Sequence, residues 1–178
     1  MLKYLAGIPL MGLFFAESAC ASDKTETAIL AGGCFWCIEA AFDGADGVIE
    51  AVSGYTGGSD PDPTYEEVSS GATGHYEAVK VTYDPKKISY TEILDIFWRQ
   101  IDPTDPGGQF ADRGNQYRAA IFYLNDAQKV AAEQSKARLA ASGRFSAPIA
   151  TEIKPSRPFY AAEDYHQKYY LRQEHVLM

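Results

Sequence analysis

The order of the predicted strands and helices is the feature that most constrains this fold. Apolar runs separated by turn residues predict a strand, a helix, two strands, a helix and a strand. A capping box of Ser89 and Glu92 marks the start of the second helix. The six elements cover residues 27–31, 34–42, 48–54, 75–83, 89–101 and 117–124. This order is that of the split β-α-β motif, so we expect an α+β, ferredoxin-like two-layer sandwich.

The remaining segments add long loops and C-terminal elements to this sandwich. Residues 56–74, with one helical turn at 65–69, and residues 102–116 are polar and rich in glycine and proline. Loops of this length usually carry function, so we expect both to contribute to an active site. The extra C-terminal elements are expected to be a helix, a strand and a helix, over 126–143, 148–153 and 159–170.

An apolar segment near the N-terminus precedes these elements. Lys3, the apolar run 4–16 and the polar stretch after it are typical of a secretory signal peptide rather than a membrane span. We expect cleavage after Ala21, which leaves one domain over residues 22–178 in the periplasm. Two alternatives remain, an uncleaved anchor and a lipoprotein attached through Cys20. The residues before Cys20 depart from the usual lipid-attachment motif.

The charge of the chain argues against one large class of partners. Over 178 residues the formal net charge is −8. Proteins that bind nucleic acid through the phosphate backbone need clustered lysine and arginine. We therefore expect no nucleic-acid partner.

The stretch "GGCFWC" allows three readings: half of a zinc site, a disulfide oxidoreductase or a nucleophilic thiol. Removal of the signal peptide leaves Cys34 and Cys37 as the only cysteines, in an oxidising compartment. A zinc site needs three or four ligands, and the three histidines are scattered without metal-site spacing. This pattern favours a redox pair over a metal site.

Cys34 lies where a predicted strand ends and a helix begins. Free backbone N–H groups and the helix dipole at such a position favour a thiolate, so we expect a lowered thiol pKa. Gly33 is expected to leave the sulfur open to approach. The alternative is that Cys34 is a small core residue, which the second cysteine three residues later makes less attractive.

Glu77 shares one face of its predicted strand with Val79 and Val81. If that is the core face, burial raises the pKa of the carboxyl toward neutrality. A carboxyl group that stays protonated near pH 7 is a candidate general acid. The alternative is that Glu77 pairs with an arginine at the edge of the sheet.

From Thr27 to Tyr170 the chain resembles the A class of peptide methionine sulfoxide reductases. The resemblance rests on "GGCFWC", "SGYTGG", "PTYEEV", "TGHYEAV", "FWRQIDPTDPGGQFADRGNQYR" and "YHQKYY", in the family's order. It implies that Cys34 is the nucleophile and Glu77 the acid. It also brings Tyr65, Tyr117 and Asp112 into the site. The same resemblance makes Phe35 and Trp36 the lining of an apolar pocket for the S-methyl group of the substrate.

The implied reaction is reduction of the S epimer of methionine sulfoxide, free or in oxidised proteins, through a Cys34 sulfenic acid. It needs no metal, flavin or nucleotide, only an external dithiol such as thioredoxin, and we expect a monomer. The chain departs from many relatives in having no cysteine after Cys37, and Ser69 and Ser70 stand where some relatives carry cysteine. Cys37 is then the internal thiol left to form a disulfide with Cys34, unless it is a bystander.

Two other classes of protein remain as alternatives. A thioredoxin-like disulfide oxidoreductase of the cell envelope would also use a Cys-x-x-Cys pair, but its β-α-β context and cis-proline loop are not recognisable here. A non-catalytic binding module of the envelope gives no reason for Cys34, Glu77 and two tyrosines to converge.

Overall fold

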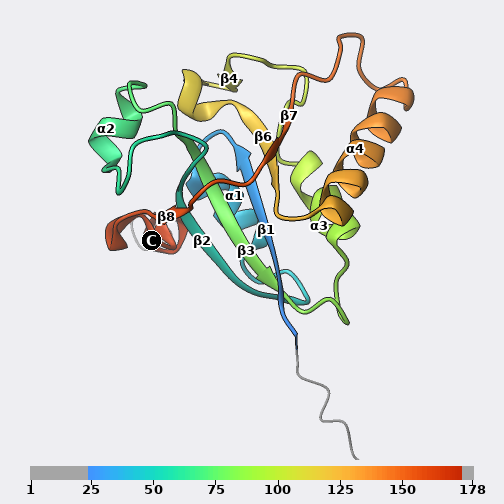
Figure 1. Cartoon of the computed structure of the whole chain (residues 1–178), viewed down its shortest axis with the longest axis horizontal. Helices are drawn as coiled ribbons and strands as arrows, with labels where there is room; N and C mark the ends of the chain where they lie inside the picture. The colour runs from blue at the N-terminus through green and yellow to red at the C-terminus, as the bar shows by residue number, and fades with distance from the viewer. Residues whose placement is uncertain (1–23, 174–178) are drawn as a thin grey trace, which may run out of the picture.

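The computed structural model describes residues 24–173 (Figure 1). The expected signal peptide over residues 1–21, its cleavage site and Cys20 lie outside the described residues. Within 24–173, no helix is both long enough and apolar enough to cross a membrane.

A sheet with strand order β7-β6-β1-β3-β2-β8 forms the centre of the molecule. Its four inner strands pair antiparallel, for example Leu30 with Val79 between β1 and β3, and Tyr55 with Glu77 between β2 and β3. The strands are β1 (Glu26–Gly32), β2 (Val48–Thr56), β3 (Tyr76–Tyr83), β6 (Ala119–Tyr123), β7 (Glu152–Pro155) and β8 (Tyr160–Ala161). β3 lies between β1 and β2, as the split β-α-β order requires, so the predicted ferredoxin-like α+β fold is confirmed.

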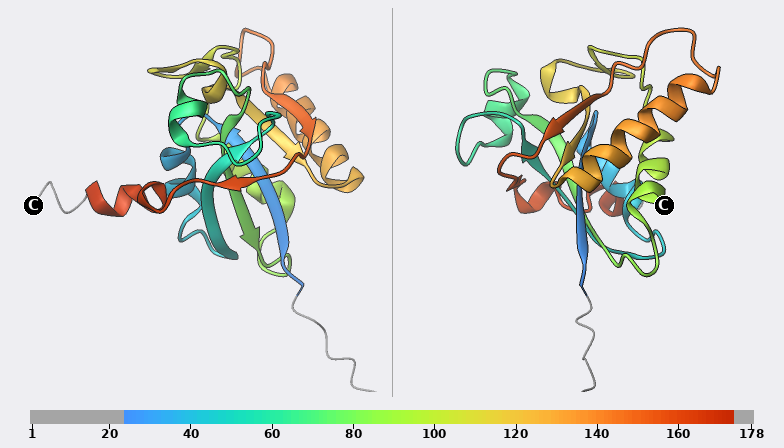
Figure 2. Two further views of the ribbon diagram at one scale, coloured as in Figure 1. Left: turned by 60° about the vertical axis from the view of Figure 1, so that its left-hand side comes forward. Right: turned by 45° about the vertical axis from the view of Figure 1, so that its right-hand side comes forward.

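Three helices cover one face of this sheet, as the right-hand view of Figure 2 shows for α3 and α4. They are α1 (Phe35–Phe42), α3 (Tyr90–Trp98) and α4 (Asp126–Ala141). The core between the layers is aliphatic and aromatic, and includes Leu30, Ile38, Phe42, Val79, Val81, Ile93 and Phe97. The predicted capping box of Ser89 and Glu92 is present at the start of α3, and this helix ends three residues before the expected boundary at residue 101.

The chain between β7 and β8 crosses the other face of the sheet (Figure 1). Phe159 of this segment packs against a smaller cluster that includes Tyr76, Ala78 and Phe122. A Cβ atom at Gly54 would lie 2.3 Å from the carbonyl oxygen of Tyr160. Only glycine therefore lets β8 pair so closely with β2.

The C-terminal elements differ from those predicted. The strand expected at 148–153 occupies Glu152–Pro155, and the expected helix over 159–170 is replaced by β8, a 3₁₀ turn η2 (Asp164–His166) and α5 (Tyr169–Gln173). The side chain of Gln167 explains the break, because it hydrogen-bonds both the N–H and the carbonyl of Ser53, at 3.0 Å each. These long-range bonds hold the segment against β2 in a path that no continuous helix could follow.

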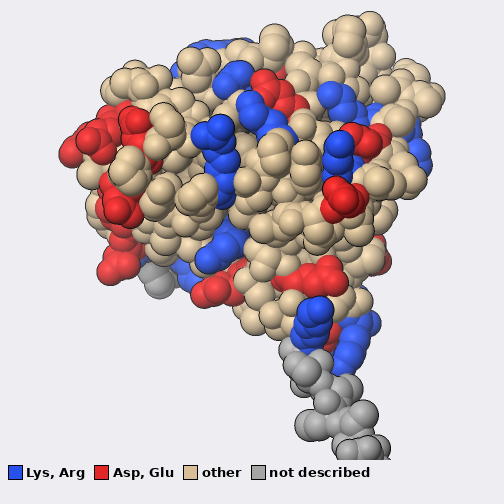
Figure 3. Space-filling model, in the orientation of Figure 1, with Lys and Arg blue, Asp and Glu red and all other residues tan. Residues whose placement is uncertain are grey.

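The two predicted loops contain short ordered elements. The first includes α2 (Tyr65–Ser69), at the expected position, and its N-terminus carries a capping box of Thr64 and Glu67. The second contains a small hairpin of β4 (Gly108–Gln109) and β5 (Asp112–Arg113), followed by a 3₁₀ turn η1 (Asn115–Tyr117). On the face seen in Figure 3, acidic side chains gather on the side of the molecule where α2 lies.

Candidate active site

The nucleophile candidate, Cys34, occupies the N-cap position of α1 and is half-buried. The chain leaves β1 through Gly33, whose φ of +87° favours glycine. A Cβ atom at Gly33 would lie 2.6 Å from the Cβ of Gln109. The glycine therefore makes room for the β4–β5 hairpin, in addition to the open approach to the sulfur that the sequence predicts.

The expected lowering of the pKa of Cys34 is wrong for this site. Burial raises the pKa of the thiol to about 12, and the nearby carboxylate of Glu77 adds to the rise. The backbone N–H groups of Trp36 and Cys37 act in the opposite direction, as the helix start predicts, but their effect is smaller. Burial and the neighbouring carboxylate thus favour the neutral thiol over the thiolate in the resting site.

The acid candidate, Glu77, lies on the core face of β3, as predicted, with 2% of its surface exposed. Its Oε2 accepts a hydrogen bond of 3.0 Å from the backbone N–H of Phe35, at the first turn of α1. The partner of Glu77 is thus a backbone N–H group, and not the arginine at the sheet edge that the alternative interpretation expects. Burial, helped by the charge of Asp112, raises the pKa of Glu77 to about 7. At neutral pH about half of the Glu77 carboxyl groups are therefore protonated and able to donate a proton.

A small pocket of about 120 Å³ brings together side chains from five separate elements. Its lining residues are Cys34, Phe35, Trp36, Tyr65, Glu77, Asp112 and Tyr117. These are seven of the eight site residues that the sequence predicts. The eighth, Cys37, is exposed on α1 and does not line the pocket.

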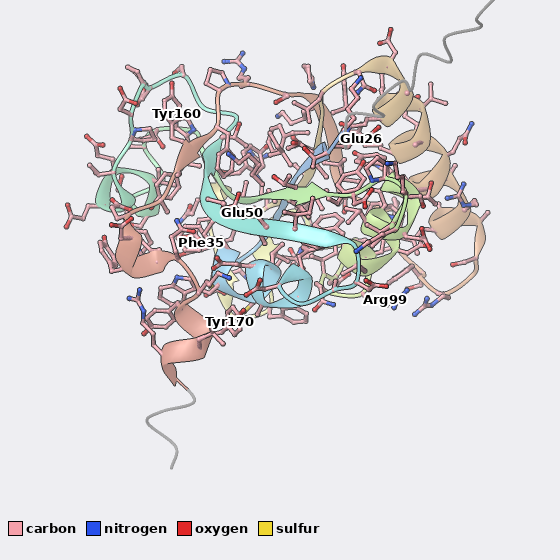
Figure 4. The ribbon with its side chains drawn as sticks, turned by 90° about the horizontal axis from the view of Figure 1, so that it is seen from below. Glu26, Phe35, Glu50, Arg99, Tyr160 and Tyr170 are labelled. Carbon is pink, nitrogen blue, oxygen red and sulfur yellow. The ribbon has the colours of Figure 1, made fainter. Side chains whose placement is uncertain are left out.

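Aromatic rings form one wall of this pocket. Phe35 is buried, and its ring stacks on that of Tyr65 at a centroid distance of 6.4 Å. Figure 4 shows Phe35 on the side of the molecule that also carries Tyr160 and Tyr170, away from Arg99 at the end of α3. Burial raises the pKa of Tyr65 and raises that of Tyr117 to about 12, with Glu77 adding to both shifts. Both phenols therefore stay protonated and can donate hydrogen bonds into the pocket.

The C-terminal segment supports this aromatic wall, and the sequence patterns did not predict this role for the segment. The indole N–H of Trp36 donates to Nδ1 of His166 at 3.2 Å, and Trp36 stacks on Tyr169 at 3.8 Å. The His166 ring also lies 4.4 Å from the ring of Tyr65. Glu163 accepts hydrogen bonds of 2.9 Å from the Tyr65 N–H and the Tyr55 hydroxyl. The only sequence signal was the motif "YHQKYY", to which no site role was assigned.

The site has no cluster of candidate metal ligands. Among residues 24–173, no three histidine, cysteine, aspartate or glutamate side chains are grouped so as to hold a metal ion. The polar groups that line the pocket are a thiol, two carboxyl groups and two phenols, from Cys34, Glu77, Asp112, Tyr65 and Tyr117.

Comparison with known proteins identifies the family. Residues 26–177 match the family model described as peptide methionine sulfoxide reductase. The peptide methionine sulfoxide reductase MsrA of Bacillus subtilis is 59% identical over 149 residues, which cover 84% of either chain. The crystal structure of Mxr1 from Saccharomyces cerevisiae in reduced form has a TM-score of 0.79 and 32% identity, and the match covers 86% of this chain and 88% of that one.

A second Mxr1 structure, in complex with Trx2, matches with a TM-score of 0.57 and 26% identity, over 83% of this chain and 86% of that one. The family match covers most of the chain, and the pocket holds the thiol, carboxyl and phenol groups that the resemblance implies. The chain belongs to the peptide methionine sulfoxide reductase family.

Proposed function

We propose that this chain reduces the S epimer of methionine sulfoxide, free or in oxidised proteins, with Cys34 as the nucleophile and Glu77 as the proton donor. One observation carries the assignment of roles. A cysteine and a carboxyl group with a pKa of about 7 line the same aromatic pocket.

In the first step the sulfur of Cys34 attacks the electrophilic sulfur of the sulfoxide. Glu77 gives its proton to the sulfoxide oxygen, and the proton of the thiol returns to the carboxylate. The S–O bond of the substrate breaks and a new S–O bond forms on Cys34, so the products are methionine and a Cys34 sulfenic acid. The substrate sulfur gains the two electrons that the cysteine sulfur loses.

The high pKa of the Cys34 thiol is compatible with this step because substrate changes its surroundings. A sulfoxide oxygen that accepts a hydrogen bond from Glu77 favours the protonated carboxyl. This removes the carboxylate charge, the second largest cause of the raised thiol pKa, while the N–H groups of Trp36 and Cys37 remain in place. The rise in the thiol pKa is therefore smaller when substrate is bound, which eases loss of the thiol proton to Glu77 as Cys34 attacks.

The remaining pocket residues position the substrate. Phe35 and Trp36 form an apolar wall for the S-methyl group, and a contact of this size discriminates by about 1–3 kcal/mol. The hydroxyls of Tyr65 and Tyr117 donate hydrogen bonds to the oxygen as charge develops on it. Asp112 lies at the rim, where it adds to the raised pKa of Glu77.

In the recycling step the thiol of Cys37 attacks the sulfenic acid, which releases water and forms a Cys34–Cys37 disulfide. A thioredoxin-type dithiol then reduces this disulfide. The yeast relative Mxr1, solved in complex with Trx2, supports a donor of this kind. We also propose that residues 1–21 direct export, so that repair takes place in the periplasm.

The test is the reaction of Cys34→Ser with methionine S-sulfoxide, followed by mass spectrometry of product and protein. Serine is too weakly ionised to replace the thiol, so we expect no methionine while circular dichroism shows an unchanged fold. Cys37→Ser is the matched control and should complete one turnover. Sulfoxide reduction by Cys34→Ser would overturn the assignment, and insulin reduction by the wild type without sulfoxide turnover would favour the thioredoxin-like alternative.

A further inference from the structure

Phe110, at the tip of the β4–β5 hairpin, is an aromatic side chain in an unusual position. It is 71% exposed, the highest exposure among the large apolar residues of the described chain. Its φ of +50° places it in the left-handed region, although it has a Cβ atom. Glycine is the preferred residue at such a hairpin position. A strained and exposed aromatic residue next to a reaction site calls for a functional explanation.

The hairpin that carries this side chain is anchored beside the active site. Gln109, the residue before Phe110, packs against Gly33 and exchanges two hydrogen bonds with the backbone of Asp102, at 2.7 and 3.0 Å. Two residues after Phe110, Asp112 lines the reaction pocket. The same hairpin thus forms one wall of the pocket and carries Phe110 on its tip.

Phe110 also borders a second, open hollow of about 350 Å³. The other wall is the loop after α4, which lies at the same end of the molecule as β4 in Figure 1. The apolar side chains that line the hollow come from Ile101, Phe110, Phe145 and Ala147. Arg144 and Thr104 lie at the same hollow and supply polar groups.

The size of the reaction pocket determines what must lie outside it. A volume of 120 Å³ corresponds to about four water molecules, enough for the end of one side chain but not for a peptide backbone. The residues that flank an oxidised methionine in a polypeptide must therefore cross the rim. Because Phe110 and Asp112 are two positions apart in the hairpin, a substrate residue one or two positions from the methionine can reach the hollow.

We propose that the hollow between Phe110 and Phe145 is a subsite for an apolar side chain next to the oxidised methionine of a polypeptide substrate. This inference rests on the proposed function and deepens it. It makes the enzyme selective among protein sites by the sequence around the sulfoxide. Contact of an apolar side chain with these rings changes kcat/KM by about tenfold.

The probe is the peptide acetyl-Gly-Gly-Met(S-oxide)-Gly-Gly-amide, with leucine placed at each flanking position in turn and dithiothreitol as reductant. For the wild type we expect leucine at one flanking position to raise kcat/KM about tenfold over the all-glycine peptide. That gain should disappear in Phe110→Gly and in Phe145→Ala, while both variants reduce the all-glycine peptide at the wild-type rate. Glycine is chosen at position 110 because it accepts the positive φ of Phe110. Ile49→Ala, which alters an exposed residue at the far end of β2, should retain the gain.

Each other result has a defined meaning. No turnover of any peptide by the wild type would contradict the proposed function itself. Three results would overturn the subsite alone. The first is wild-type turnover that does not depend on leucine, and the second is a leucine gain that survives in both Phe110→Gly and Phe145→Ala. The third is loss of activity on the all-glycine peptide in these variants. The peptide assay is repeated with thioredoxin in place of dithiothreitol. A higher KM for thioredoxin in Phe110→Gly, with the leucine gain intact, would overturn the subsite and make this surface the docking site of the donor.

Discussion

Replacement of Glu77 by glutamine separates the two effects of this carboxyl group on the site. Glutamine keeps an oxygen that can accept the hydrogen bond from the Phe35 N–H, but it has no proton to donate. It also removes the charge that contributes to the high pKa of Cys34. We therefore expect a more easily ionised thiol in a slower enzyme, a combination that a purely structural role for Glu77 would not produce.

The magnitudes follow from the position of Glu77. Loss of a general acid lowers the rate of a proton-transfer step by about 10²–10⁴-fold. The pKa rises from 4.5 to about 7 in the folded protein, and each unit corresponds to about 1.4 kcal/mol, so the buried carboxylate costs about 3 kcal/mol above neutral pH. Because the folded-state pKa is raised, the wild type has this stability below pH 4.5 and loses it as the pH rises through 7.

Three assays, each run between pH 4 and pH 8.5, test these effects. They are single-turnover reduction of methionine S-sulfoxide, alkylation of Cys34 and denaturant unfolding. The wild-type rate should fall as Glu77 loses its proton above pH 7, and Glu77→Gln should lack this dependence. Alkylation should be faster in Glu77→Gln. From low to high pH, the free energy of unfolding should shift by about 3 kcal/mol in favour of the variant. A rate loss below about threefold, or slower alkylation, would refute the reasoning.

Three further predictions concern the neighbours of this pair. In wild-type protein that lacks residues 1–21, one equivalent of sulfoxide should convert two free thiols to none, whereas Cys37→Ser should stall as a sulfenic acid with a thioredoxin donor. If one wild-type thiol remains free and turnover is unchanged in the variant, Cys37 is a bystander. Assays with separated epimers should show reduction of the S form and not the R form, and equal rates would contradict the class assignment. Gly33→Ala should lower the free energy of unfolding by about 1–3 kcal/mol in denaturant titrations, because the φ of Gly33 is +87° and an added Cβ would meet Gln109. Gly143→Ala is the control, because its φ is also positive, at +70°, but an added Cβ would meet no atom within 4 Å. The difference between the two variants gives the effect of the contact with Gln109.

Much of the fold follows from patterns between near neighbours in the sequence. The two-residue spacing of Glu77, Val79 and Val81 predicts β3 and places Glu77 on its core face, because successive side chains of a strand point to opposite faces. The first four positions of β3 are buried on both faces, which this spacing does not predict. The box of Ser89 and Glu92 predicts the start of α3 because it needs only four consecutive residues. The motifs, read through the family resemblance, predict seven residues that line one pocket.

Tertiary structure decided what depends on distant partners. The helix start alone suggested a low pKa for Cys34, but burial by the surrounding elements and the charge of Glu77 from β3 outweigh the local N–H groups. The segment after β7 has a helical pattern, yet Gln167 binds the backbone of Ser53, 114 residues away, and the helix is broken. Desolvation and long-range hydrogen bonds exist only after the chain has folded, whereas strand periodicity and helix caps are present in the sequence itself.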